Sequence, residues 1–178
     1  AEQISRRLGQ PDAVLAAYQA AFDDSQEPQL AEHVGRRLVE FQEEWSDDST
    51  RTLPLLKAIF ERCSDAFWAF DRLKLAYNGA GRWEDLFSLY DHAIARVEQN
   101  ESKAEMLREA AMAAKDFAND ANRAIEYFER LDKLCPNDAR VEAALERLYE
   151  RQNLIRPLID LLVRQMARAS SASQQFPI

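Results

Sequence analysis

The apolar residues of this chain recur every three or four positions, which is the spacing of one face of an α-helix. Leu86, Leu89, Tyr90, Ala93 and Val97 are an example. No segment alternates apolar and polar residues as a half-buried strand would, and 178 residues include only 4 glycines and 6 prolines. The pattern predicts an all-helical chain with helices of roughly 12 to 19 residues. Breaks are predicted around residues 9–12, 23–28, 46–50, 78–81, 99–102, 118–121, 135–138 and 152–153.

The pattern of one predicted helix returns along the chain. The segment GRWEDLFSLYDHAI, residues 81–94, reappears as GQPDAVLAAYQAAF from Gly9 and as NDANRAIEYFERL from Asn119. The spacing is 30 residues from Leu56 to Leu86, 38 from Leu86 to Ala124 and 34 from Ala124 to Leu158. The period is therefore near 34 residues, with insertions and deletions in the turns. Leu86, Tyr90 and Ala93 correspond to Val14, Tyr18 and Ala21, to Ala124, Phe128 and Leu131, to Leu56, Phe60 and Cys63, and to Leu158 and Leu162.

This repeat resembles the tetratricopeptide repeat, a pair of antiparallel helices called A and B. The best copy spans residues 67–99, where the matching residues are Phe70, Leu73, Tyr77, Gly81, Tyr90 and Ala93. Lys74 and Leu86 depart from the pattern, because they replace small residues that let the two helices approach closely. The next copy ends at Pro136 and needs one extra residue in its turn. The resemblance implies an all-α fold, a right-handed α-solenoid of antiparallel helix hairpins with about nine or ten helices.

The repeats are expected to form one domain over residues 1–169. Residues 28–63 are a divergent copy in which helix A is prolonged through Phe41 and Trp45. Residues 1–8 match only the end of a helix A, so we expect a piece of a longer array. Residues 170–178 are small and polar, and we expect a flexible tail there.

The charge of the chain argues against nucleic acid as a partner. The 23 Lys and Arg are outnumbered by 31 Asp and Glu, for a net charge of −8, which repels phosphate backbones. Only residues 139–178 carry more basic than acidic side chains, 6 against 4. No apolar run approaches the roughly 20 residues needed to cross a bilayer, so we expect no membrane insertion and a cytoplasmic location.

The sequence gives catalysis and cofactors little support. The glycines at 79 and 81 follow no strand, so a helix turn is favoured over a nucleotide loop. Glu84 and Asp85 are adjacent and point about 100° apart on a helix, which suits a first turn better than an acid–base pair. His33 and His92 have no other metal ligands at coordinating distance in sequence. We therefore expect no enzyme, no cofactor and no metal site.

The two cysteines, Cys63 and Cys135, occupy matching positions two repeats apart. Stacked helices would separate them by on the order of 20 Å, beyond the reach of a disulfide. Both are expected to be reduced.

The resemblance also implies a concave groove lined by helix A side chains. Three copies contribute Trp68, Asp71, Leu75 and Asn78; Glu105, Arg108, Met112 and Lys115; and Arg140, Ala143, Arg147 and Glu150. These are mixed in charge, and their apolar centre flanked by Arg108 and Arg147 fits an amphipathic helix or a hydrophobic peptide with acidic neighbours. The alternative for Trp68 is packing against the preceding repeat.

Two functions follow from this reading. The first is a non-catalytic scaffold or adaptor that binds a peptide or helix of a partner protein in the groove. The alternative is a structural or regulatory self-association domain of a larger assembly, since an exposed end of a repeat stack can pair two copies into a homodimer.

Overall fold

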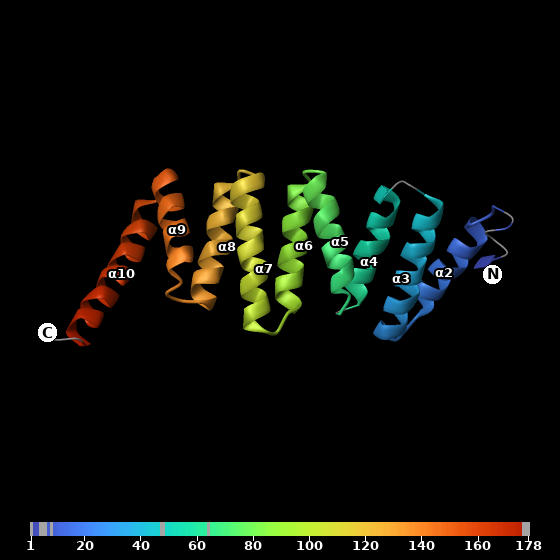
Figure 1. Ribbon diagram of the computed structural model, residues 1–178, viewed down its shortest axis with the longest axis horizontal. Helices are drawn as coiled ribbons and strands as arrows, with labels where there is room; N and C mark the ends of the chain where they lie inside the picture. Colours follow the sequence, from blue (N-terminus) through green and yellow to red (C-terminus); the bar gives the residue numbers. More distant parts are fainter. Residues whose placement is uncertain (1, 4–6, 8, 47–48, 64, 176–178) are drawn as a thin grey trace. The chain divides into compact units, whose positions relative to one another are not determined.

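The computed structural model describes residues 2–3, 7, 9–46, 49–63 and 65–175, and these contain helices and turns but no strand. Asp47 and Asp48 of the predicted break, and residues 176–178 of the expected tail, lie outside the described residues. The all-α class and the succession of helix hairpins are confirmed (Figure 1). The helices are α2 Asp12–Asp24, α3 Pro28–Trp45, α4 Leu53–Arg62, α5 Phe67–Gly79, α6 Trp83–Arg96, α7 Asn100–Met112, α8 Ala121–Leu134, α9 Ala139–Arg151 and α10 Ile155–Gln175.

Two segments of other helical geometry accompany them. The 3-10 turn η1, Ser49–Thr52, precedes α4, and the π turn η2, Ala113–Phe117, continues α7. The prolonged helix A predicted around Phe41 is confirmed, because α3 runs through Trp45. At the other end, α10 continues to Gln175, past the expected domain boundary at residue 169.

The chain divides into two compact units, residues 1–89 and 90–178. In the first unit, α3 packs between α2 and α4, and α4 packs on α5. Gly35 of α3 permits the close approach, since a Cβ atom there would lie 2.8 Å from Cγ1 of Ile59 and 3.1 Å from Cε2 of Phe22. Its core also includes the ring pair Phe60 and Phe70, with centroids 5.8 Å apart.

In the second unit, α8 packs against α7 and α9, and α10 packs on α9. The aromatic residues predicted for the core are buried, with Tyr90 and Phe128 at 3% and 4% exposure. Buried tyrosines also fix neighbouring helices by hydrogen bonds. The Tyr90 hydroxyl donates to Glu109 at 3.0 Å and the Tyr149 hydroxyl donates to Glu129 at 2.9 Å.

The turns that precede α2, α6, α8 and α10 share one backbone feature. Gly9, Gly81, Asn119 and Asn153, the residues that open the aligned segments, all have positive φ, between 52° and 65°. Glycine and asparagine tolerate this left-handed conformation, which ends a helix by redirecting the chain. After α5, the amide of Arg82 donates to the carbonyl of Tyr77 at 2.9 Å. After α9, the amide of Leu154 donates to the carbonyl of Tyr149 at 2.8 Å. The helical repeat is therefore visible in the backbone as well as in the sequence.

Arginines at matching positions connect three of the helices B, α4, α8 and α10, to the preceding helix B. In α4, Arg62 donates to the carbonyl of Phe22 at the end of α2, at 2.5 Å. In α8, Arg130 pairs with Asp91 of α6 at 2.6 Å, and in α10, Arg164 pairs with Asp132 of α8 at 2.9 Å. Arg130 and Arg164 are 34 residues apart, which is the local spacing of the repeat.

Candidate binding pocket

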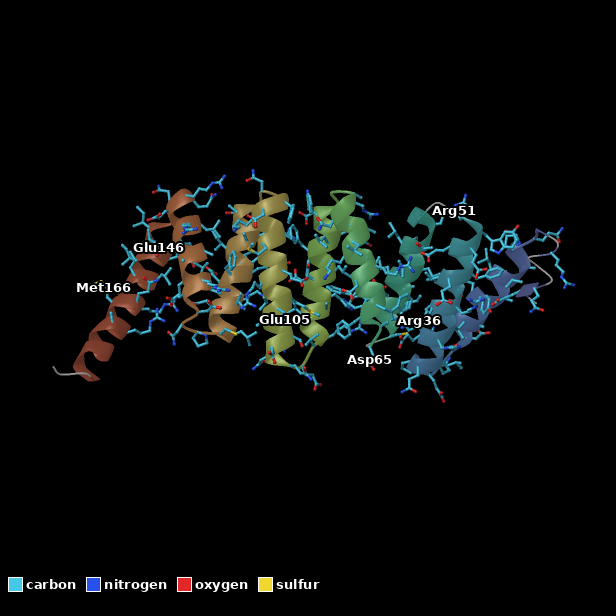
Figure 2. All side chains as sticks on the ribbon, in the orientation of Figure 1. Arg36, Arg51, Asp65, Glu105, Glu146 and Met166 are labelled. Atoms are coloured by element: carbon cyan, nitrogen blue, oxygen red, sulfur yellow. The ribbon has the colours of Figure 1, made fainter. Side chains whose placement is uncertain are left out.

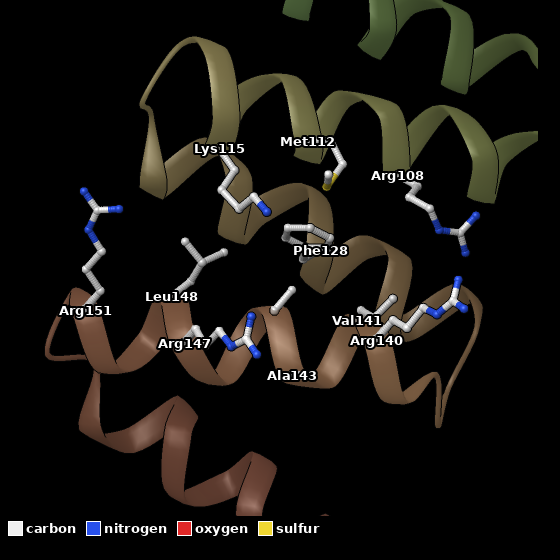
Figure 3. A pocket seen from close by; sticks show the side chains of 11 residues that line it. Arg108, Met112, Lys115, Phe128, Arg140, Val141, Ala143, Arg147, Leu148 and Arg151 are labelled. Atoms are coloured by element: carbon white, nitrogen blue, oxygen red, sulfur yellow. The ribbon is translucent and has the colours of Figure 1, made fainter.

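A pocket of about 510 Å³ opens in the second unit between α7, the π turn η2, α8 and α9 (Figure 3). Pockets of this size commonly receive part of a ligand or a few side chains of a peptide. Six of the predicted groove residues are brought together here: Arg108, Met112, Lys115, Arg140, Ala143 and Arg147. The lining is completed by Phe128 of α8 and by Val141, Ala144, Leu148 and Arg151 of α9.

One wall of the pocket is the exposed face of α9. Arg140, Arg147 and Arg151 are seven and four residues apart, so they recur on one side of the helix together with the small Ala143 and Ala144. All three arginines are exposed, and in the part of the chain that the structure describes no carboxylate forms an ion pair with them. Because the alanine side chains in the middle of this face are small, the guanidinium groups surround an open space.

The opposite wall comes from α7 and its π turn. Arg108 and Met112 are one helical turn apart on α7, and Lys115 lies in η2. Here the amide of Ala118 donates to the carbonyl of Ala113 at 3.0 Å and that of Asp120 to Ala114 at 2.9 Å. The residues joined by these bonds are five and six positions apart in sequence. At the ends of α5 and α9 the longest such bond joins residues five positions apart, so the end of α7 contains one more residue. The extra turn residue expected from the sequence is this π turn, a feature often found at functional sites.

Apolar side chains form the base of the pocket. Phe128, Val141 and Leu148 are buried, while Met112 is partly exposed above them. Figure 3 shows Met112 and Phe128 between the cations of α7 and those of α9. The pocket therefore combines an apolar base with a charged rim, which fits a ligand that has both characters.

The rim carries positive charge only. Five cations and no carboxylate line the pocket, in a chain whose net charge is −8. Acidic groups meet two of the cations from outside: Asp138 lies 3.5 Å from Arg108 and Asp116 lies 3.2 Å from Lys115. The carboxylate of Asp138 is also the N-cap of α9, accepting the amides of Arg140 and Val141.

The lining of this pocket is less mixed in charge than the predicted groove. Glu105 and Glu150 were predicted to share the groove, but neither lines the pocket. Arg151, which the repeat alignment did not select, does line it. On α9 the alignment identified Arg140, Ala143 and Arg147, and it differs from the pocket face where Arg151 takes part instead of Glu150.

The four groove residues predicted on α5 belong to the first unit and have different surroundings. The indole of Trp68 donates to Glu32 at 2.9 Å, and Arg36 lies over its ring at 4.6 Å. Trp68 thus packs against α3 of the preceding hairpin, as the alternative interpretation held. Asp71 pairs with Lys74 at 3.4 Å, and Leu75 and Asn78 are exposed on α5. None of these four residues lines the pocket of the second unit.

The buried side of α9 is fixed by Tyr149. Burial raises the pKa of its phenol, and so does the hydrogen bond that it donates to Glu129 of α8. The phenol therefore stays neutral and remains a donor throughout the physiological range. This bond holds the side of α9 opposite to the pocket against α8.

The remaining candidates for chemistry can be placed among the described residues. No group of three or more His, Cys, Asp or Glu in this part of the chain could hold a metal ion. Asp85 pairs with Arg82 at 2.8 Å in the turn before α6. Cys63 and Cys135 are both free thiols, as expected. No helix among the described residues is long and apolar enough to span a membrane.

Comparisons with known proteins find similarity in fold but not in sequence family. No protein-family model matches the chain, and no curated protein is similar to it in sequence. Among solved structures, the MamA RS-1 ArsTM double mutant is 15% identical, with a TM-score of 0.44 over 97% of this chain and 93% of that one. A crystal structure of MamA is 16% identical, with the same TM-score over 95% and 96%. MamA is a helical-repeat protein, and a similarity at this level carries no argument about what this chain binds.

Proposed function

We propose that this chain is a protein-binding module without chemistry of its own, and that the pocket of the second unit receives a peptide or helix of a partner. The observation that carries the proposal is the lining of that pocket, where five cations surround a base of Met112, Phe128 and α9 side chains. A segment with an apolar side chain between carboxylates complements both features. The apolar side chain would enter between α7 and α9.

The apolar base accounts for affinity and the cations for selectivity. Burial of an aliphatic side chain contributes roughly 1.5 to 3 kcal/mol, whereas exposed ion pairs contribute about 1 kcal/mol or less each. Several cations acting on neighbouring carboxylates still discriminate strongly against a peptide segment that is basic or uncharged. Phosphate could satisfy the same cations, but a nucleic acid would meet the repulsion of the remaining acidic surface.

The test uses a short fluorescent peptide in which one leucine is flanked by glutamates, with fluorescence anisotropy as the readout. Arg147→Glu should weaken binding by about tenfold or more, because it replaces an attraction by a repulsion within the pocket. Lys133→Glu is the matched control, since Lys133 is exposed on α8, changes the net charge equally and does not line the pocket. A peptide with glutamine in place of glutamate should also bind more weakly.

Two results would contradict the proposal. Equal losses for Arg147→Glu and Lys133→Glu would mean that net charge alone governs binding. Tighter binding of a single-stranded oligonucleotide than of the peptide, lost in Arg147→Glu, would replace a protein partner by a nucleic acid. Circular dichroism of each variant shows whether the helices persist.

A further inference from the structure

The last described helix, α10, has one face that is firmly attached to the second unit. Leu161 is buried at 1% exposure, and two arginines of the same side reach neighbouring helices. Arg164 pairs with Asp132 of α8 at 2.9 Å, and Arg168 pairs with Glu142 of α9 at 2.5 Å. These contacts set the rotation of α10 about its axis and therefore determine which residues face outward.

The outward face of α10 is apolar. Ile155, Ile159, Leu162, Val163 and Met166 are between 37% and 69% exposed. Figure 2 shows Met166 projecting from the side of α10 away from α9. We call these five residues the α10 stripe. Their exposed parts amount to roughly 500 Å², near the upper limit for an apolar patch on a monomeric protein.

The matching positions in the preceding repeat are buried against neighbouring helices. Ile125 and Phe128 of α8, which precede Ile159 and Leu162 by 34 residues, are 6% and 4% exposed. They are buried because α9 packs beside α8. The α10 stripe is thus a surface of the kind that elsewhere in this unit is covered by another helix. The repeat alignment predicted that Leu162 belongs to the core, but in the structure this residue is 37% exposed.

We propose that two copies of this chain pair through the α10 stripe, with the two α10 helices antiparallel. Ile155, Ile159, Leu162 and Met166 are spaced four, three and four residues apart, which is the seam of a two-helix coiled coil. In an antiparallel pair centred between residues 160 and 161, Ile159 lies opposite Leu162 of the second copy and Ile155 lies opposite its Met166. Every seam residue then meets an apolar partner.

Size and geometry favour a second copy in this arrangement. Pairing two stripes would bury about 1,000 Å² of surface in total, the lower bound for a specific interface. The antiparallel orientation opposes the helix dipoles favourably, and a parallel dimer would place the β-branched Ile155 and its copy at a seam position where leucine is preferred. A membrane surface is the other occupant that the test must distinguish, because α10 carries Arg156, Arg164 and Arg168 against the single acid Asp160, whereas the net charge of −8 of the whole chain repels anionic lipid.

The test compares molar mass by light scattering for the whole chain and its variants. The unmodified chain should show a mass that rises toward that of a dimer as the concentration increases into the ~0.1 to 1 mM range. Ile159→Asp with Leu162→Asp should remain monomeric at every concentration. Leu75→Asp is the matched control, since Leu75 is a leucine on α5 that is even more exposed than Leu162, and this variant should dimerise normally. Unchanged helicity separates loss of pairing from unfolding.

Cysteine crosslinking tests the orientation. In a Cys135→Ser background, a mixture of Ile155→Cys and Met166→Cys chains should form a disulfide between copies under mild oxidation. Either protein alone should not, because identical positions lie about 16 Å apart along an antiparallel pair, beyond disulfide reach. Cys63 is buried and needs no substitution.

Three results would overturn the inference. One is a monomeric mass at about 1 mM, which excludes pairing of useful strength. The second is a dimer that persists in the Ile159→Asp, Leu162→Asp variant, or crosslinks between identical positions, since either requires another arrangement. The third is a monomer that sediments with anionic vesicles and loses this property in the same variant, which would make the stripe a lipid-binding face.

Discussion

Substitution of Gly35 by alanine tests the close approach on which the first unit depends. An added Cβ would lie 2.8 Å from Cγ1 and 2.9 Å from Cδ1 of Ile59, and 3.1 Å from Cε2 of Phe22. Favourable carbon contacts are about 3.5 to 4.0 Å, so α3 and α4 must separate or Ile59 must leave its rotamer. Ile59 is fully buried and Phe22 nearly so, which leaves little room for either side chain to move.

The magnitude is the difference between two opposing effects. Overpacking of a buried site costs about 1 to 3 kcal/mol, whereas replacing glycine inside a helix by alanine gains about 1 kcal/mol. We therefore expect Gly35→Ala to lower the free energy of unfolding by up to about 2 kcal/mol. Gly79→Ala is the matched control. Gly79 ends α5 with no atom near its added Cβ, so the same change should be neutral or stabilising there.

Denaturant unfolding followed by tryptophan fluorescence measures this effect in the right unit. All three tryptophans, Trp45, Trp68 and Trp83, lie in residues 1–89, so their emission reports on the first unit. Ile59→Val should cost about 1 kcal/mol in the natural chain but less in the Gly35→Ala background, because it removes one of the crowding atoms. The reasoning is refuted if Gly35→Ala matches Gly79→Ala in stability, or if the Ile59 effect is the same in both backgrounds.

Two further predictions concern the second unit. Phe128→Ala should cost about 3 to 5 kcal/mol in a thermal or denaturant melt, because the ring is buried between α8 and α9, and a loss below about 1 kcal/mol would place it on the surface. Alkaline pH should also destabilise the fold. Burial raises the pKa values of Tyr127 and Tyr149, so above a pH of about 10 the unfolded chain loses tyrosine protons that the folded chain retains. Stability should fall as the pH rises through this range, and Tyr149→Phe should lessen the fall. An equal slope in both proteins would contradict the assignment.

The helical repeat could be predicted because its signals are local. The spacing of Tyr90 and Ala93 defines a helix face, and glycine or asparagine opens four of the aligned segments where the turn needs positive φ. Such features depend on residues a few positions apart, which the sequence presents directly. The prolonged α3 was likewise recognisable from its apolar residues through Trp45.

The chemistry of the pocket could be predicted only in part. The repeat alignment found six lining residues, Arg108, Met112, Lys115, Arg140, Ala143 and Arg147, but it also included Glu105 and Glu150 and omitted Arg151. Neighbouring positions on a helix point about 100° apart, so a small error in the assumed face exchanges one charge for the other. The face that α9 presents is set by its buried residues, Leu145 and Tyr149 among them, and by its packing on α8, which no short sequence pattern specifies.

The pocket and the net charge of the chain act over different distances. At physiological ionic strength the Debye length is about 8 Å, so an approaching acidic peptide is influenced little by carboxylates elsewhere on the molecule once it reaches the rim. Farther away, the net charge of −8 gives it no attraction toward the protein. The cations should therefore stabilise the bound state more than they accelerate the encounter. It follows that charge reversal of Arg147 should act mainly on the dissociation rate, in contrast to a charge outside the pocket that steers a ligand from a distance.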